Sequence, residues 1–241
     1  MKTTLYSATS RGTAKHGWLT ANHYFSFAGY FNPERINFGA LRVLNDDVIV
    51  GGKGFGEHPH ENMEIITIPL QGILKHKDSM SNQWIELGIG EVQVMSAGTG
   101  LYHSEINGST SQHLKLFQIW IFPNKQAVEP RYHQKYFLPQ ERENTLQTLV
   151  SSFDHPEENS LKIHQDAKIS RILLSLDNKF DYQLMSKMHG VFVLVIDGTI
   201  EIDKHVLKTR DAIGIENVEN FKIKALESSD ILFIEVPMEQ I

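Results

Sequence analysis

The sequence predicts an all-β protein that contains two β domains, each a sandwich or a barrel, joined by a linker. Three observations support this prediction. The apolar runs are short and rich in valine, isoleucine and phenylalanine, they end at glycine, asparagine or aspartate, and helical periodicity is weak. The chain has 241 residues, which is enough for two small β domains or one large one.

The first group of predicted strands occupies the N-terminal half. Apolar runs at 64–72, 90–98 and 114–123 are too short for typical helices, and turn signals at 79–83 and at Asn107-Gly108 separate them at hairpin-like intervals. Residues 123–160 then hold four prolines and many charges. Such a composition is typical of a connection, which can carry short strands or a helical turn of its own.

Strand-like sequence resumes at 161–170 and continues through 191–203 and 231–238. The segments "EIITIPLQGILKHKD" and "VFVLVIDGTIEIDK" share an apolar run, a glycine and an alternating strand. A duplicated β unit would leave this similarity, although any antiparallel hairpin can also produce it. We therefore divide the chain into an N-terminal domain at 1–130, a linker at 131–160 and a C-terminal domain at 161–241.

Composition narrows the class of protein. No run of about 18 apolar residues is present, and the first residues lack the apolar stretch of a signal peptide, so we expect neither a membrane span nor export. The chain has no cysteine, which excludes disulfides and thiolate metal sites and fits a cytoplasmic location. The net charge of −6 and the absence of a basic block argue against direct nucleic-acid binding.

Two pairs of residues in the first half have the spacing of metal ligands. His58 and His60 are two residues apart, as are His103 and Glu105, and alternate residues of a strand point to the same side, about 6.6 Å apart. Two such pairs facing each other supply three imidazoles and one carboxylate, which suit Fe, Mn, Ni, Cu, Co or Zn. A single H-x-H motif is more often a surface feature, but both pairs follow glycine-rich turns, and this combination favours a metal site. By contrast, His76 in "KHKD" is predicted to lie on a solvated strand face.

The second half lacks equivalent residues. Candidate ligands lie 14, 12 and 8 residues before Gly72, and the same offsets before Gly198 reach Leu184, Ser186 and Gly190, none of which chelates a metal usefully. His189 and His205 fall out of this register, so we interpret both as ordinary polar residues. The sequence therefore predicts one metal ion per chain, in the N-terminal domain.

The quoted motifs resemble a known family. "GFGEHPHENMEIITIPLQG" is similar to the first motif of cupins, and "GTGLYHSEIN" to the second, whose skeleton corresponds to Gly100, His103 and Asn107. The segment "HGWLTANHYFSFAGYFNPERINFGALRVLNDD" and the motif "HPHENME" resemble the pirin family specifically. The resemblance covers essentially the whole chain and is nearest to bacterial pirin-like proteins with quercetin 2,3-dioxygenase activity.

The resemblance implies a bicupin, with two tandem jelly-roll-like cupin barrels and one divalent transition metal in the first. The ligands of pirins fall on His58, His60, His103 and Glu105, with iron as the first expectation and Cu, Ni, Mn, Co or Zn as alternatives. Cupins in general take their glutamate from the first motif, here Glu64, which we expect instead to support the ligands from behind or to be structural. This chain also departs from many cupins by having Gly98 where they have proline.

The resemblance further implies a dioxygenase that cleaves the central ring of a flavonol such as quercetin with O₂ and releases carbon monoxide. Glu105 would be both a ligand and the base that accepts the flavonol proton. Candidates for the pocket wall are Phe38, Phe55 and Met63, although each is more often ordinary core. Two alternatives remain: a pirin-like metal-sensing or redox-sensing module that binds a protein partner, and a pocket for another small molecule. The sequence leaves the native metal, the physiological substrate and the oligomeric state open.

Overall fold

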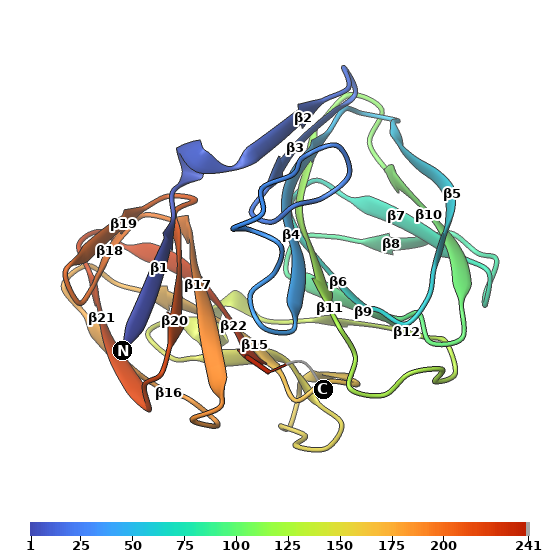
Figure 1. The fold of residues 1–241 in the computed structure, drawn as a ribbon. Helices are drawn as coiled ribbons and strands as arrows, with labels where there is room; N and C mark the ends of the chain where they lie inside the picture. The colour runs from blue at the N-terminus through green and yellow to red at the C-terminus, as the bar shows by residue number, and fades with distance from the viewer. Residues whose placement is uncertain (240–241) are drawn as a thin grey trace.

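The computed structural model describes residues 1–239 and consists of two β-barrels that lie side by side (Figure 1). Each barrel combines a seven-stranded sheet with a four-stranded sheet. The prediction of an all-β bicupin is confirmed.

The N-terminal barrel holds the two motifs with the candidate ligands. Its larger sheet has the order β12-β9-β6-β11-β4-β3-β2, and its smaller sheet has the order β5-β10-β7-β8. The bounds of these strands are β2 (Gly12–Lys15), β3 (Leu19–His23), β4 (Leu41–Ile49), β5 (Gly54–His60), β6 (Glu64–Gln71), β7 (Leu74–Asp78), β8 (Ile85–Leu87), β9 (Glu91–Ser96), β10 (Leu101–Asn107), β11 (Leu114–Ile121) and β12 (Arg131–Tyr136).

The C-terminal barrel repeats this architecture, with sheets of the order β1-β20-β17-β22-β15-β13-β14 and β16-β21-β18-β19. Two short 3₁₀ helices, η1 (Ala8–Ser10) and η2 (Pro139–Arg142), lie in connections. The strands are β1 (Lys2–Tyr6), β13 (Gln147–Ser152), β14 (Leu161–Ile163), β15 (Lys168–Leu174), β16 (Lys179–Gln183), β17 (His189–Asp197), β18 (Thr199–Ile202), β19 (His205–Lys208), β20 (Ala212–Glu216), β21 (Asn220–Ala225) and β22 (Ser229–Pro237).

Strand pairing links the two halves of the chain more closely than the sequence division suggests. The first strand, β1, pairs with β20 of the C-terminal barrel, with Lys2 opposite Glu216. The segment 131–160 contributes β12 to the N-terminal barrel, where it pairs with β9, and β13 to the C-terminal barrel, where it pairs with β15. The expected linker therefore extends both large sheets.

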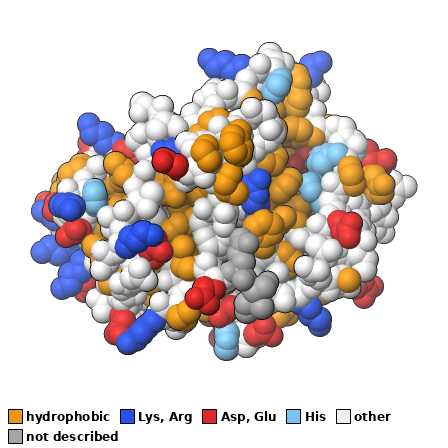
Figure 2. All heavy atoms as spheres, in the orientation of Figure 1, with side chains coloured by type: hydrophobic (Ala, Val, Ile, Leu, Met, Phe, Trp, Pro, Cys, Tyr) orange, Lys and Arg blue, Asp and Glu red, His pale blue; other side chains and the backbone are white. Residues whose placement is uncertain are grey.

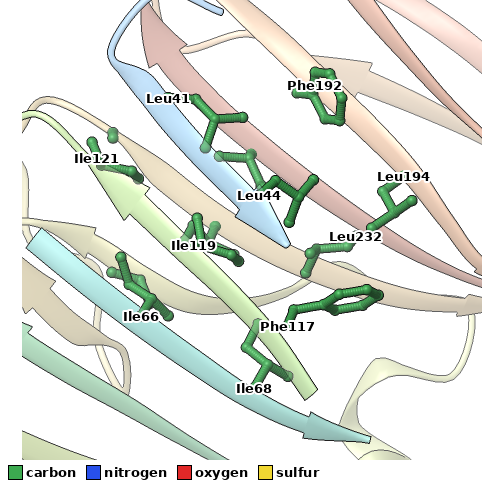
Figure 3. Packing of buried hydrophobic residues seen from close by; sticks show 14 of the residues in the cluster. Leu41, Leu44, Ile66, Ile68, Phe117, Ile119, Ile121, Phe192, Leu194 and Leu232 are labelled. Atoms are coloured by element: carbon green, nitrogen blue, oxygen red, sulfur yellow. The ribbon is translucent and has the colours of Figure 1, made fainter. Parts of the chain in front are cut away.

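A large apolar core lies between the two barrels. The two seven-stranded sheets pack against each other, and side chains from β4, β6 and β11 meet side chains from β17 and β22 (Figure 3). Phe117 and Ile119 of β11 face Leu232 of β22 across this interface. Since burying one such side chain stabilises the fold by roughly 1.5–3 kcal/mol, this core holds the barrels together as one body.

The interiors of the two barrels differ in a way that positions the site. The C-terminal barrel is filled by one continuous apolar cluster, which includes Leu184, one of the residues at an offset equivalent to a candidate ligand. The N-terminal barrel holds two smaller apolar clusters, one around Leu74 and Leu116 and one around Ile65 and Met95. Polar side chains occupy the rest of its interior.

The outer surface is mixed in charge. Figure 2 shows lysine and arginine side chains interspersed with aspartate and glutamate on the face in view. Among the described residues, no helix is long and apolar enough to cross a membrane.

Candidate metal centre

Strands β5 and β10 carry the candidate ligands and pair antiparallel in the smaller sheet. His103 lies opposite His58, Leu101 lies opposite His60, and the register shifts by a bulge between His103 and Glu105. β5 is at the edge of the sheet, a position that tolerates Pro59, because proline has no backbone N–H to donate to a neighbouring strand. His103 and Glu105 are buried, in keeping with the alternation along β10. Figure 2 shows histidine side chains at the surface of this barrel, in the region of β5 and β10.

The three imidazole rings approach one another through their Nε2 atoms. Nε2 of His103 lies 2.9 Å from Nε2 of His58 and 2.9 Å from Nε2 of His60. Nδ1 of His58 is 2.8 Å from the carbonyl oxygen of Gly56, which can only accept a hydrogen bond. Nδ1 of His58 therefore carries the proton, and its Nε2 keeps a free lone pair directed at the other two rings.

Glu105 lies beside this group in the barrel interior. Gln118 donates a hydrogen bond from Nε2 to Oε2 of Glu105 at 2.7 Å, whereas no described residue bonds to the buried Oε1. His58, His60 and His103 form one group that could hold a metal ion, and His76, His103 and Glu105 form a second that shares His103. The structure thus brings the three predicted imidazole ligands together, whereas the fourth predicted ligand, Glu105, groups with His103 and His76.

The protonation states suit metal binding. Burial lowers the pKa of His103 to about 3 and that of His60 to about 4, so both rings are neutral at physiological pH. Burial alone would raise the pKa of Glu105, but the neighbouring imidazoles of His76 and His103 and the hydrogen bond from Gln118 outweigh it and leave the pKa below its ordinary value. Neutral imidazoles and an ionised carboxylate with a free oxygen fit a divalent transition metal.

His76 belongs to this site, and the prediction of a solvated strand face was wrong. Its side chain is fully buried and stacks on the ring of Tyr132, with 4.8 Å between ring centroids. Its Nε2 lies 3.2 Å from Oδ2 of Asp78, and its Nδ1 lies 4.0 Å from Oε1 of Glu105. Strand alternation in "LKHKD" could have revealed the burial of His76, because Lys75 and the second lysine of this segment share the outward face and the histidine between them points inward.

A pocket of about 500 Å³ opens onto the imidazoles. Its volume falls within the range of small-molecule sites. Of the three predicted wall residues, Phe55 lines the pocket, whereas Phe38 and Met63 do not. Aromatic walls that the sequence analysis missed come from Trp18, Phe27 and Trp120. The polar part of the wall, apart from the candidate ligands, consists of Asn45, Asp47, Glu57 and Gln118.

Phe38 and Met63 have other places in the fold. Phe38 lies in the core between the barrels, where its ring packs edge-on against Phe192, with 5.8 Å between centroids. Met63 packs against the apolar cluster around Ile65 and Met95. The prediction that Phe38 and Met63 line the pocket was therefore wrong. Each side chain packs in an apolar cluster instead of facing the pocket.

Glu64 does not touch the candidate ligands. It lies on the same side of β6 as Ile66, which faces the other barrel, and its Oε2 accepts a hydrogen bond from Ser96 at 2.7 Å. Burial raises the pKa of Glu64 to about 7. Asn62, with a φ of 46°, interrupts the chain between β5 and β6 and turns Glu64 away from His60. Of the two roles expected for Glu64, these contacts favour the structural one.

Gly98, in the second motif, occupies a position where a side chain would clash. Gly98 has a φ of 48°, and a Cβ at this position would overlap the carbonyl oxygen of Val128. The turn before β10 therefore packs directly on the segment that follows β11, and a side chain would displace one of them.

In the C-terminal barrel, His189 sits between two carboxylates. Its Nδ1 lies 3.1 Å from Oε1 of Glu235, and its Nε2 lies 3.3 Å from Oδ2 of Asp166. Each nitrogen thus faces a separate acceptor, so the ring does not direct a free lone pair into a shared site. This arrangement fits an ordinary polar residue, and one metal ion per chain remains a prediction.

The fold and the histidine cluster place the chain among two-barrel cupin proteins. Residues 6–121 match the pirin family, and residues 149–236 match the quercetinase C-terminal cupin domain. The chain belongs to the pirin family, as the sequence motifs predicted. It is 41% identical over 233 residues to the quercetin 2,3-dioxygenase of Escherichia coli strain K12, covering 97% of this chain and 98% of that protein.

Other relatives agree with this assignment. A pirin-like protein of Caulobacter vibrioides is 37% identical over 224 residues, which are 93% of this chain and 95% of that protein. The crystal structure of the bacterial pirin YhhW from Escherichia coli in complex with nickel(II) superimposes with a TM-score of 0.91 at 39% identity, covering 98% of this chain and 99% of that one.

Proposed function

We propose that this protein is a metal-dependent dioxygenase that cleaves the central ring of a flavonol such as quercetin with O₂ and releases carbon monoxide. The observation that carries the proposal is the convergence of three imidazole Nε2 atoms at the base of a pocket with aromatic walls. Flat aromatic rings match such walls, and the free Nε2 lone pairs suit a metal ion that binds an oxygen of the ligand.

The relatives support the same activity. A protein named quercetin 2,3-dioxygenase is 41% identical along nearly the whole chain, and a bacterial pirin has been crystallised with nickel(II). We propose one divalent transition metal per chain, with iron as the first expectation and nickel among the alternatives. When bound, such a metal supplies a Lewis acid that lowers the pKa of a ligand hydroxyl group.

The residues of the chain have distinct roles in this proposal. His58, His60 and His103 hold the metal as neutral imidazoles, and Glu105 is the fourth ligand. Glu105 also accepts the flavonol proton, at the Oε1 atom that has no partner among the described residues. Gln118 fixes the other carboxylate oxygen by donating a hydrogen bond to it, and this leaves Oε1 without a hydrogen bond, 4.0 Å from Nδ1 of His76. The aromatic walls exclude water and orient the flat rings.

The test is anaerobic reconstitution with each metal in turn, followed by exposure to air and assay of quercetin loss and carbon monoxide. We expect many turnovers per metal ion, and a His103→Ala variant treated in the same way should show none. A pirin-like interaction module without a substrate would bind quercetin at most stoichiometrically. Binding without turnover for every metal would overturn the proposed reaction.

A further inference from the structure

Two consecutive aspartates on β4 have opposite surroundings. Asp46 faces the other barrel, and its Oδ2 accepts hydrogen bonds from Arg11 at 2.9 Å and from Arg210 at 3.1 Å. Asp47 points to the other side of the strand, into the pocket of the N-terminal barrel. Its side chain is only 3% exposed, and Oδ1 is buried without a hydrogen-bond partner among residues 1–239.

The two amide side chains in the pocket wall, those of Asn45 and Gln118, make hydrogen bonds to residues other than Asp47. Asn45 is paired with His23, with 2.8 Å between Oδ1 and Nδ1, and Gln118 donates to Glu105 at 2.7 Å. Buried polar atoms in native proteins nearly always have partners, and an exception calls for an explanation. Since Asp47 lines the pocket, a molecule bound there can donate the hydrogen bond that the carboxyl group lacks.

We propose that Asp47 determines ligand specificity by accepting a hydrogen bond from a second hydroxyl group of the flavonol, distinct from the oxygen that the metal site takes. The inference rests on the proposed function and narrows its substrate class to polyhydroxylated flavonols. A carboxyl group keeps an acceptor lone pair whether it is ionised or protonated, so this role does not depend on the charge of Asp47.

A ligand that lacks the second hydroxyl group would leave Oδ1 buried and unpaired after the pocket closes around it. A site built to pair with a hydroxyl group rejects an analogue without it much more strongly than an apolar pocket rejects one fewer methylene group. Asp47 would therefore distinguish flavonols by their hydroxyl pattern, while the aromatic walls accept the common ring system.

The test measures ligand affinity without turnover. The metal-loaded protein is titrated anaerobically with quercetin and with flavonols that keep its metal-binding 3-hydroxyl and 4-keto groups but lack one other hydroxyl group each. For the wild type, at least one of these deletions should weaken binding by about tenfold or more. In Asp47→Ala, the same deletion should change the affinity by less than about twofold, and Asp47→Asn, which keeps an acceptor oxygen, should retain part of the discrimination.

Two controls separate this role from a structural one. Asp46→Asn changes the neighbouring carboxylate, which faces away from the pocket, and should leave the selectivity unchanged. Removing an unpaired buried oxygen should not destabilise the ligand-free protein, so Asp47→Ala should unfold at a temperature no lower than that of the wild type.

The outcomes are distinct from those of the proposed function. If flavonols bind and are turned over but Asp47→Ala discriminates among them as the wild type does, the specificity role of Asp47 is refuted and the proposed reaction stands. If the metal-loaded wild type binds no flavonol, the proposed function fails and the role of Asp47 fails with it.

Discussion

The substitution Glu64→Gln should stabilise the protein above neutral pH and leave its stability near pH 4 unchanged. Glu64 is 1% exposed in the interface between the barrels. Burial raises its pKa from 4.5 to about 7, and the hydrogen bond from Ser96 and the charge of Arg131 offset only part of this effect. A neutral amide of the same shape avoids placing a charge at this position.

The sign and size follow from proton linkage. Between pH 4.5 and about 7, the folded protein holds a proton that the unfolded chain has released, so the free energy of unfolding falls as the pH rises through this window. A difference of about 2.5 pH units corresponds to roughly 3 kcal/mol. For a chain of this size, the midpoint of thermal unfolding should rise by roughly 6–12 °C at pH 8.

The assay is thermal unfolding of metal-free wild type and Glu64→Gln, followed by circular dichroism at pH 4, 6 and 8. The matched control is Glu61→Gln, which changes an exposed glutamate three residues away and should have little effect at any pH. An equal difference between Glu64→Gln and the wild type at all three pH values would refute the linkage argument. The metal content of Glu64→Gln after reconstitution should equal that of the wild type.

Three further predictions concern the site. The variant His103→Ala should lose most of the single metal ion that we expect per chain but keep the circular dichroism of a folded β protein; two tightly held ions per wild-type chain would contradict this. The variant Glu105→Gln should keep metal and flavonol binding but lose turnover by roughly 10²-fold or more, whereas activity that follows metal occupancy alone would exclude Glu105 as the base. The variant Phe55→Ala should weaken flavonol binding measured by titration, while Phe38→Ala should lower the free energy of unfolding by roughly 3–5 kcal/mol and leave that binding unchanged.

Much of the fold could be predicted because strand alternation is a local property. Short apolar runs and turn residues identified strands such as β6, β9, β11, β17 and β22, and the i, i+2 spacing was enough to expect His58 and His60 on one side of a strand. The same spacing placed His103 and Glu105 on a second strand, and the resemblance to pirins then implied that all four residues are ligands. The structure pairs these two strands, so that local spacing becomes a cluster of ring nitrogens.

Two positions show the limits of reading alternation from the sequence. Glu64 was expected to support the ligands or to be structural, and the left-handed backbone at Asn62, which breaks the strand after His60, favours the structural role. His76 was assigned to the solvent because lysines flank it. Lysines at alternate positions of a strand lie on its outward face, however, so the residue between them points inward.

The place of Phe38 could not be predicted from local pattern at all. Phe38 lies just before β4, outside any strand, and packs into the core between the barrels. A strand of the larger sheet is itself buried on both faces, and the sequence does not indicate which face meets its own barrel and which meets the other. The same uncertainty concealed Trp120, which lines the pocket while its neighbour Ile119 faces the other barrel.

Each larger sheet is buried on two faces, one toward the interior of its own barrel and one toward the other barrel. Neither half of the chain can therefore fold with its apolar surface covered when the other half is absent. Leu44 and Phe117 on one side, and Phe192 and Leu232 on the other, would all be exposed to water if the chain were cut between the barrels. A minimal catalyst consisting of the first half alone would therefore aggregate through the surface that the second half covers. The second half fills its own interior with apolar side chains in place of chelating residues, and it covers the first half through the outer face of its larger sheet.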